Sequence, residues 1–340
     1  MILSDNLKCA FKKLVYFIKL KVYSPTKERG VVAIGCGNWG KVNIKNVILS
    51  KKWNLTGCFD TNFRNSFELA SKYNIHHYLS LDEICSDRGV DAVIISTPLR
   101  THKEIVMKFA NAGFHIFIEK PMVSDPEIAY ELVEFCENSG VLIEVGAQLR
   151  YEDLIRDVKK VIVEGRLGGP ISMEAQNFVN NKNERLKLSI KEDVEFRNSM
   201  LELGIHFVDL VYFLFGPIKN GKCVKNIIEN PLKSNHFLLE MIAKSCSGVM
   251  INIRSSFLID RKFFCKIEFE NGYIEFTNKG VLTEYDASYK QTHKKKYCEF
   301  LKRSGILQFR EFRKSVDSLT NRTNKEEVRQ ILNCVTKKEF

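Results

Sequence analysis

Two short segments of the chain carry residue types suited to hydride transfer. The first is Gly35–Gly40 (GCGNWG), which follows the apolar run 31–34 and has the G-x-G-x-x-G form. Such glycines make a tight strand-to-helix turn, let the backbone approach a pyrophosphate and leave a helix N-terminus pointing at the anion. The second is Glu119-Lys120-Pro121, which follows the apolar run 116–118 and places a lysine at the end of a strand. Together the two segments indicate a dehydrogenase.

Asp60 adds a third element to the expected dinucleotide site. It lies 20 residues after Gly40, at the end of the run 55–59. An acidic side chain there accepts hydrogen bonds from an adenosine ribose and repels a 2′-phosphate. We therefore expect NAD as the cofactor, with NADP as the less favoured alternative. Arg64, about one helical turn further on, is a weaker indication of NADP.

The elements around these residues alternate between strand and helix up to about residue 150. Strands are predicted from the apolar runs 31–34, 55–59, 92–95, 115–118 and 141–145, and helices around 39–51, 63–73, 101–112 and 125–138. Repeated strand–helix–strand units imply a parallel sheet covered on both faces. Ligands bind such sheets at the carboxyl ends of the strands, which is where the glycine turn, Asp60, Thr97-Pro98 and Lys120 belong.

The pattern changes after residue 150. Helices are expected at about 152–164 and 199–215, and the second ends at Gly216-Pro217. A largely antiparallel sheet is predicted from the runs 171–179, 222–228, 236–243, 249–258, 263–270 and 273–277, with turns at Ser247-Gly248 and Asn271-Gly272. Helical patterning near 296–317 and 325–335 predicts a C-terminal tail that packs back onto the body. The fold class is therefore α/β, with an N-terminal Rossmann domain and a C-terminal α+β domain that contains an open, mainly antiparallel sheet.

Length and composition favour two domains. At 340 residues and 44% hydrophobic content the chain can bury two cores. We expect an N-terminal extension over 1–29, a dinucleotide-binding domain over 30–150 and a substrate-binding and oligomerisation domain over 151–340. The ten cysteines are scattered singly, without C-x-x-C pairs or metal-ligand spacing with histidine, so we expect no metal and a reducing, cytoplasmic environment. The sequence contains no stretch of about 18 uncharged apolar residues, so we expect no transmembrane helix.

The net charge of +11 is concentrated at the two ends of the chain. Residues 1–30 hold seven basic and two acidic residues and residues 290–340 hold fourteen and six, so the stretch between them is nearly neutral. Lys294-Lys295-Lys296 lacks aromatic–basic interleaving, which argues against a nucleic-acid partner. Residues 7–21 predict a basic amphipathic helix. We favour its packing against the body or a partner subunit, and contact with the inner membrane face is the alternative.

Taken together, these motifs resemble the glucose-fructose oxidoreductase and inositol dehydrogenase family, often written Gfo/Idh/MocA, over about residues 31–338. Further matching segments are 90–98 (VDAVIISTP) with Thr101-His102, Ala112–His115, and the Glu202-x-Gly204-x-His206-x-x-Asp209 pattern. The family joins a Rossmann domain to an open antiparallel sheet, and most members oxidise or reduce a sugar, cyclitol or nucleotide-linked sugar with NAD or NADP. The resemblance implies a cofactor site formed by Gly35, Cys36, Gly37, Asn38, Trp39, Gly40, Asp60, Ser96, Thr97, Pro98, His102, Glu119 and Lys120.

Lys120 and His206 are the two candidates for the acid–base group, because oxidation of a hydroxyl needs a proton acceptor near the transferred hydride. A lysine beside a cationic nicotinamide has a lowered pKa, and a histidine titrates near neutrality. Glu202 lies four residues before His206 on one predicted helix, so the two side chains face the same way. The family usually has aspartate at this position. The alternatives are a surface Glu119–Lys120 pair and a His206–Glu202 pair with a structural role only.

Arg150 and Tyr151 complete the expected substrate site with Lys120 and His206. The resemblance implies that Arg150 approaches substrate hydroxyls, a carboxylate or a phosphate, and a salt bridge at the domain interface is the alternative. Asp209 is expected to be structural. The chain departs from the family at Ala147, where many relatives have histidine, and at residues 198–201 (NSML), where they carry glycines. The loops around 177–198 are expected to set specificity, and they contain no motif that names a substrate.

The resulting hypothesis is an NAD-dependent oxidoreductase that transfers a hydride between nicotinamide and a hydroxyl or keto carbon of a sugar, cyclitol or nucleotide-sugar. This hypothesis includes a role in surface polysaccharide biosynthesis. It also includes a homodimer or homotetramer formed through the C-terminal sheet. Two alternatives remain open at this point. One is a non-catalytic NAD(P)-binding sensor or regulator of the same fold, and the other is an NAD-assisted glycoside hydrolase.

Overall fold

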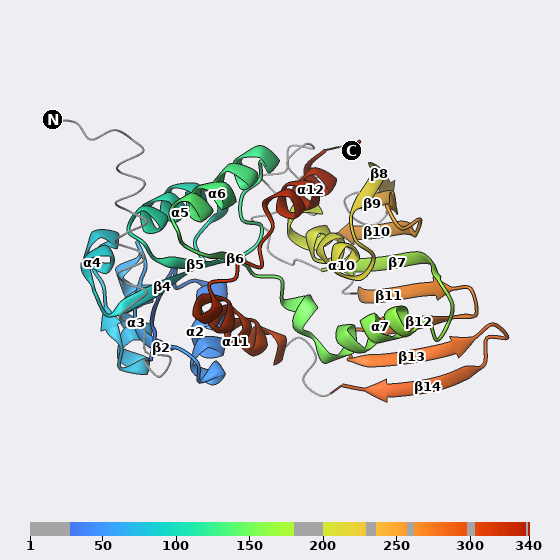
Figure 1. Cartoon of the computed structure of the whole chain (residues 1–340), viewed down its shortest axis with the longest axis horizontal. Helices are drawn as coiled ribbons and strands as arrows, with labels where there is room; N and C mark the ends of the chain where they lie inside the picture. Colours follow the sequence, from blue (N-terminus) through green and yellow to red (C-terminus); the bar gives the residue numbers. More distant parts are fainter. Residues whose placement is uncertain (1–27, 180–199, 229–235, 257–261, 298–302, 338) are drawn as a thin grey trace. The chain divides into compact units, whose positions relative to one another are not determined.

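The computed structural model describes residues 28–179, 200–228, 236–256, 262–297, 303–337 and 339–340. The predicted N-terminal helix and nearly all of the 177–198 loops lie outside these residues. The chain forms two units, each described by itself (Figure 1). The first contains residues up to Val123, Glu127–Gly146 and Gly305–Lys325, and the second contains Ser124–Pro126, Ala147–Ser304 and Glu326–Phe340. The domain boundaries expected at residues 29 and 150 stay predictions.

A six-stranded parallel sheet forms the centre of the first unit, in the order β3-β2-β1-β4-β5-β6. Its strands are β1 (Gly30–Ile34), β2 (Asn54–Phe59), β3 (His76–His77), β4 (Val90–Ile95), β5 (His115–Ile118) and β6 (Ile143–Val145). The five predicted strands are confirmed, and the two-residue β3 was not predicted. The strand order reverses between β1 and β4, and ligands of such sheets bind at the carboxyl ends of the strands at this switch point.

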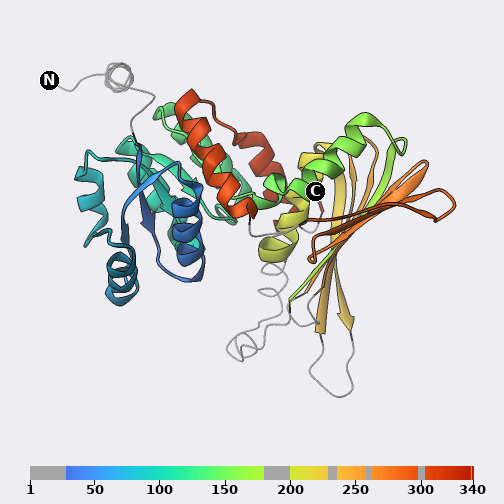
Figure 2. The same cartoon turned by 90° about the horizontal axis from the view of Figure 1, so that it is seen from below.

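Helices cover both faces of this sheet (Figures 1 and 2). They are α2 (Asn38–Ser50), α3 (Phe63–Tyr73), α4 (Leu81–Ser86), α5 (His102–Asn111), α6 (Pro126–Asn138) and α11 (Arg303–Ser318). Alternate residues of β1, Val31 and Ala33, join a buried cluster with Ile44 of α2, Leu69 of α3 and Phe312 of α11. Val32 and Ile34 point to the opposite face of β1 because side chains alternate along a strand, and they are buried as well. Strand β1 is therefore apolar on both faces, as expected for a parallel sheet that helices cover on both sides.

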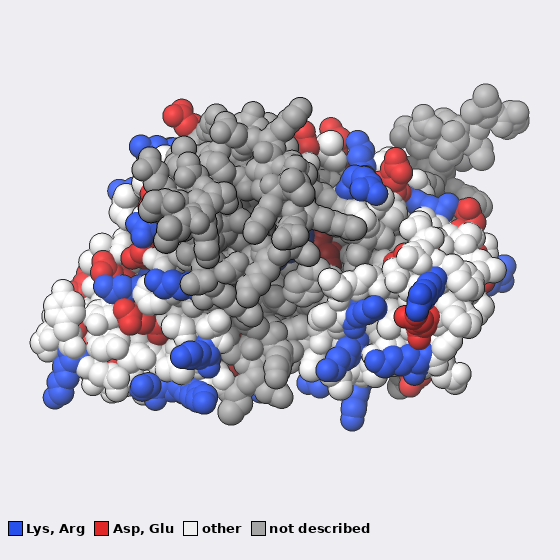
Figure 3. Space-filling view, turned by 180° about the vertical axis from the view of Figure 1, so that it is seen from behind, with Lys and Arg blue, Asp and Glu red and all other residues white. Residues whose placement is uncertain are grey.

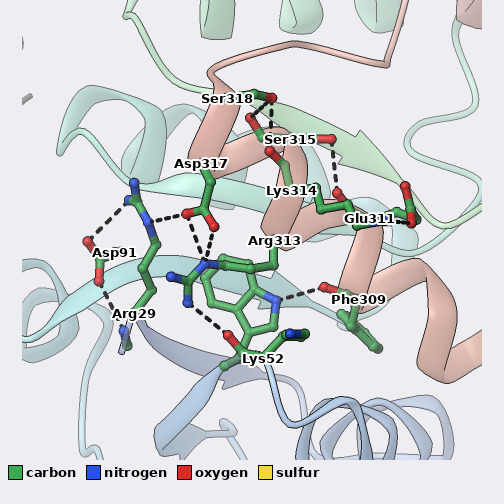
Figure 4. Close-up of polar contacts among 12 residues, drawn as sticks. Arg29, Lys52, Asp91, Phe309, Glu311, Arg313, Lys314, Ser315, Asp317 and Ser318 are labelled. Carbon is green, nitrogen blue, oxygen red and sulfur yellow. Dashed lines mark hydrogen bonds and ion pairs between the residues drawn. The ribbon is translucent and has the colours of Figure 1, made fainter. Parts of the chain in front are cut away.

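Helix α11, from the C-terminal part of the chain, packs back into the first unit as predicted for the tail (Figure 4). Trp53 stacks on Phe312 with ring centroids 5.1 Å apart, and its Nε1–H donates to the Phe309 carbonyl at 2.9 Å. Arg313 pairs with Asp317 on the same helix and donates to the Lys52 carbonyl at 2.8 Å. Loss of a buried aromatic of this kind costs about 3–5 kcal/mol, so α11 is an integral part of this unit.

The second unit contains an eight-stranded mixed sheet in the order β14-β13-β12-β11-β7-β10-β9-β8. Its strands are β7 (Pro170–Phe178), β8 (Ile218–Ile228), β9 (His236–Ser245), β10 (Met250–Ser256), β11 (Lys262–Phe269), β12 (Gly272–Thr277), β13 (Val281–Asp286) and β14 (Gln291–Lys296). β7 and β10 pair in parallel and the other neighbouring strands pair antiparallel. The six predicted extended runs and the predominantly antiparallel sheet are confirmed.

Strands β13 and β14 were both missed by the sequence analysis, and the pattern of β14 is not that of a half-buried strand. Every residue of Gln291–Lys296 is exposed. The strand lies at the edge of the sheet, where lysines discourage pairing with another chain. The Lys294–Lys296 run is therefore part of a solvated edge strand. Lys295 pairs with Asp157 at 2.6 Å.

Helices α7 (Asp153–Glu164) and α10 (Ile205–Phe215) lie against one face of this sheet (Figure 2), and α12 (Lys325–Thr336) belongs to the same unit. In the described ranges no helix is long and apolar enough to cross a membrane. On the molecular face drawn in Figure 3, acidic side chains lie among the basic ones.

Candidate active site

The glycine-rich turn between β1 and α2 forms a cradle lined by backbone. Side chains at its glycine positions would fill this cradle. Gly35 has a φ of +88°, and a Cβ built there would lie 2.7 Å from the Ser96 carbonyl oxygen. A Cβ on Gly40 would lie 1.9 Å from the Gly35 oxygen, whereas one on Gly37 would meet no atom within 4 Å. Gly37 is the N-cap of α2, and no side chain caps this helix. Amide groups at a helix N-terminus bind a pyrophosphate, so the turn fits a dinucleotide.

The Asp60 carboxylate lies directly against this cradle. Its Oδ2 accepts a hydrogen bond from the Cys36 amide at 2.6 Å, and its Oδ1 accepts one from the Asn62 amide at 2.7 Å. Arg64, the weaker indication of NADP, instead pairs with Glu68 at 2.8 Å and is largely exposed. A fixed carboxylate beside the glycine turn fits ribose hydroxyls and disfavours a 2′-phosphate.

The turn after β4 contains Ser96, Thr97, Pro98 and, at the start of α5, His102. The Ser96 amide donates to the Ile34 carbonyl at 2.8 Å, which joins this turn to the end of β1. His102 is buried, with Nδ1 2.9 Å from the Met122 carbonyl and Nε2 2.8 Å from the Thr97 carbonyl. Both ring nitrogens are thus used by the protein, and His102 supports the two loops that follow β4 and β5.

Trp39 and Asn38 occupy the first turn of α2. The Trp39 side chain is exposed, 54% by surface area, although it is a large aromatic residue. Its position one residue before Gly40 keeps it a candidate for contact with the dinucleotide. The role of each predicted cofactor-binding residue remains a prediction.

Lys120 follows β5 at the same carboxyl edge of the sheet. The Glu119 amide donates to the Ile95 carbonyl at 3.0 Å, and the Glu119 Oε1 accepts from the Asn43 side-chain amide at 2.6 Å. Burial raises the pKa of Glu119, and the Asn43 hydrogen bond and the Lys120 charge act in the opposite direction. The Lys120 Nζ is shielded from solvent. Lys120 and the dinucleotide cradle thus belong to the same compact unit.

Glu202 and His206 belong to the second unit, where the predicted single helix has two parts. Met200–Gly204 is a π-helical turn, and α10 starts at Ile205. Gly204 permits this geometry, because a Cβ there would lie 2.8 Å from the Met200 sulfur. A π-helical turn has more residues per turn than an α-helix, so the expected alignment of Glu202 with His206 is altered. Glu202 is exposed and His206 is half-buried.

An asparagine holds the π-helical turn in place. The Asn177 Nδ2 on β7 donates to the Leu203 carbonyl at 3.1 Å. Residues 198–201 are the segment that differs from the family's glycine-rich pattern. Residues 198 and 199 lie outside the described residues, and Met200 and Leu201 are buried. Apolar packing therefore replaces the family's glycines at Met200 and Leu201.

Arg150 lies in the 3-10 turn η2 (Gln148–Tyr151) and pairs with two carboxylates of the second unit. Its Nη2 and Nε donate to Asp209 at 2.7 and 3.0 Å, and Nη2 also contacts Glu327 of α12. The two carboxylates raise the pKa of Arg150 despite the opposing effect of burial. Asp209 thus makes an ion pair with η2 rather than within its own helix, and its expected structural role stays a prediction. Substrate contact by Arg150 or Tyr151 stays a prediction.

Sequence reasoning missed Asn43, Asn177 and Glu327. Asn43 is buried on the inward face of α2, and a polar residue among the apolar positions of a predicted helix is the pattern that would have found it. Asn177 and Glu327 carry no such pattern, because their partners lie 26 and 177 residues away.

Comparison with known proteins agrees with this geometry. Residues 29–147 match the family model GFO_IDH_MocA, described as "Oxidoreductase family, NAD-binding Rossmann fold". The first unit therefore has an NAD-binding oxidoreductase fold, and residues 29–147 match the NAD-binding domain of the Gfo/Idh/MocA family. This confirms the resemblance, the fold class and the expectation of an NAD-binding fold.

Relatives extend the similarity beyond the Rossmann unit. The scyllo-inositol 2-dehydrogenase (NAD(+)) of Bacillus subtilis is 29% identical over 207 residues, 60% of this chain and 59% of that protein. The 2,7-anhydro-N-acetylneuraminate hydratase of Escherichia coli is 31% identical over 186 residues, 54% and 49%. The chain spans about half the length of the curated relatives it matches. The structure of UDP-N-acetylglucosamine 3-dehydrogenase from Acidithiobacillus ferrooxidans superposes with a TM-score of 0.75 at 19% identity, over 91% of this chain and 96% of that one.

Proposed function

We propose that the protein is an NAD-dependent oxidoreductase that acts on a secondary hydroxyl, or the corresponding ketone, of a sugar, cyclitol or nucleotide-linked sugar. The observation that carries this proposal is the placement of Lys120 in the same unit as the cradle, at the carboxyl edge of the same sheet. The Bacillus subtilis relative is an inositol dehydrogenase, and the structurally similar Acidithiobacillus ferrooxidans protein is a dehydrogenase of a nucleotide-linked sugar, which supports the substrate class.

The residues of the cradle bind and orient the dinucleotide in this proposal. Gly35, Gly37 and Gly40 let the backbone approach the pyrophosphate, and Asp60 accepts hydrogen bonds from the adenosine ribose. NAD, when bound, supplies the acceptor for the hydride that leaves the carbinol carbon. The arrangement of Asp60 favours NAD over NADP.

Lys120 takes the proton of the substrate hydroxyl as the carbon–hydrogen bond breaks, and returns it in the reverse direction. A positioned acid–base group of this kind contributes about 10²–10⁴-fold to the rate. His206, with Glu202 as its partner, is the second candidate for the proton acceptor. Arg150 and Tyr151 are proposed to border the substrate.

A steady-state screen tests the proposal. Wild-type protein is incubated with NAD and a panel of sugars, cyclitols and nucleotide-linked sugars while the absorbance of NADH is followed. Reduction of NAD by a panel member, and its loss in Lys120→Met, is the expected result. Binding of NAD without turnover on any member would favour a dinucleotide-binding sensor, an alternative supported by the exposed Glu202 and the altered π-helical turn.

A second candidate is NAD-assisted bond cleavage without net oxidation. It is favoured by the hydratase activity in the name of the Escherichia coli relative. Release of a free sugar from an anhydro-sugar or glycoside, detected by mass spectrometry of the incubation products and without accumulation of NADH, would identify it.

We also propose that copies assemble through the eight-stranded sheet, as a homodimer or homotetramer. Met250 supports this proposal, because it is exposed on the face of β10 opposite to the buried Ile251. Light scattering of the purified protein measures the mass directly, and a monomer at micromolar concentration would contradict the assignment. A role in surface polysaccharide synthesis, with the N-terminal extension near a membrane, would follow if nucleotide-linked sugars are the substrates.

A further inference from the structure

Asn43 is a fully buried polar residue on the helix that begins at the glycine cradle. It is 1% exposed, and it is polar although the neighbouring buried positions Ile44 and Val47 of α2 are apolar. Its Nδ2 donates to the Ser96 Oγ at 3.0 Å and to the Glu119 Oε1 at 2.6 Å. A side-chain amide nitrogen carries two hydrogens, so both are engaged.

The two acceptors follow neighbouring strands. Ser96 comes directly after β4 and Glu119 directly after β5, and these strands pair in parallel. Asn43 thus joins α2 to two strand ends at the edge of the sheet where the cradle lies. The backbone of Gly146 lies close to the other carboxylate oxygen of Glu119, because a Cβ built on this glycine would be 3.3 Å from Oε2. A buried amide that meets a carboxylate at this distance makes a strong, charge-assisted hydrogen bond.

We propose that Asn43 is a positioning residue that fixes the Glu119-Lys120 segment relative to the dinucleotide cradle. The inference rests on the proposed role of Lys120. Because Lys120 is bonded covalently to Glu119, a carboxylate that is held by α2 fixes the backbone from which the lysine extends. A displacement of about 1 Å in a reacting group costs about 10²-fold in rate, so a residue that does not touch substrate controls turnover through this hydrogen bond.

The isosteric change Asn43→Asp tests the hydrogen bond with the least change in volume. It replaces the donor with an acceptor and places two carboxyl groups where 2.6 Å now separates nitrogen and oxygen. Two carboxylates at that distance repel one another or share a proton. We expect kcat to fall at least 10-fold. The KM for NAD should change less than about threefold, because the glycine turn is unaltered and the Ser96 hydroxyl can donate to the new carboxylate. Asn54→Asp, at the exposed start of β2, is the matched control and should behave as wild type.

The double variant Asn43→Asp/Glu119→Gln exchanges donor and acceptor. The amide introduced at position 119 then donates to the carboxylate introduced at position 43, and the pairing is restored with the charge on the other side chain. We expect its kcat to lie within about threefold of Glu119→Gln alone and well above that of Asn43→Asp. This comparison also applies if Asn43→Asp alone does not fold. A double variant no better than Asn43→Asp, or an Asn43→Asp kcat within threefold of wild type, overturns the proposal.

A second readout separates this proposal from the proposed function. The Lys120 Nζ is shielded from solvent, so an amine reagent such as acetic anhydride should modify it slowly, as followed by mass spectrometry of its peptide. Modification at least several-fold faster in Asn43→Asp, and unchanged in Asn54→Asp, supports the positioning role even if no sugar is turned over. Equal modification rates in wild type and Asn43→Asp overturn it, whether or not the protein is a dehydrogenase.

Discussion

Replacement of Arg150 by methionine decides whether this arginine holds the second unit together or binds substrate. The Arg150 side chain is 22% exposed, and its two partners, Asp209 and Glu327, are 13% and 33% exposed. The substitution keeps an unbranched side chain but removes the guanidinium that joins these two carboxylates. Their mutual repulsion would then no longer be offset by this cation.

The magnitude follows from this burial. Breaking a buried pair costs about 3–5 kcal/mol, because a charge is left unpaired. The partial exposure of Glu327 lets solvent reduce the penalty, so we expect a loss of about 3 kcal/mol in the free energy of unfolding of the second unit. We expect the loss of stability to appear first in α10, where Asp209 lies three residues after His206.

Hydrogen exchange of the α10 amides, measured with urea unfolding, follows the second unit specifically, since two units need not unfold together. Arg156→Met, at an exposed position of α7, is the matched control and should cost less than about 0.5 kcal/mol. In Arg150→Met, stability within about 0.5 kcal/mol of wild type, together with a large rise in the substrate KM, would refute a structural role. It would instead show that Arg150 contacts substrate.

Three further predictions concern the cofactor and the acid–base groups. Because Asp60 is held by the Cys36 amide beside the cradle, NAD should bind at least 10-fold more tightly than NADP, and Asp60→Ala should reduce that ratio. Calorimetric titration with both cofactors measures the ratio, and tighter binding of NADP would contradict the prediction. Lys120→Met should retain NAD binding and lose about a hundredfold or more in kcat, and a loss below threefold would exclude Lys120 as the acid–base group. His206→Ala and Glu202→Gln should each reduce kcat strongly while the double variant is little worse than the poorer single variant, as for residues that act as a unit; multiplicative losses would show that Glu202 acts separately.

The Rossmann unit follows from local sequence because each feature there is encoded within a few residues. Apolar runs mark the strands of the parallel sheet, and the glycine spacing of Gly35–Gly40 reflects approaches as short as 1.9 Å that exclude a Cβ. Asp60 was placed correctly beside the turn because both follow strands that pair in register, with Ile34 opposite Phe59. The positions of these strands and of the glycine turn can therefore be predicted from a single sequence.

Features that depend on distant partners could not be predicted in the same way. The π-helical turn before His206 depends on Met200 packing over Gly204 and on Asn177 from β7. The pairing of Arg150 with Glu327 joins residues 177 positions apart. Strand β14 is exposed along its whole length and is defined by its pairing with β13 rather than by an apolar face.

Direct transfer of hydrogen from substrate to NAD is the measurement that tests the central claim most closely. Wild-type protein is given NAD and sugars, cyclitols or nucleotide-linked sugars that carry deuterium on the carbinol carbon, and the nicotinamide product is analysed by mass spectrometry. The account predicts that at least one panel member yields deuterium-labelled NADH, with a rate that falls about a hundredfold or more in Lys120→Met. Binding of NAD with no labelled NADH from any member, or labelling at an unchanged rate in Lys120→Met, would contradict it.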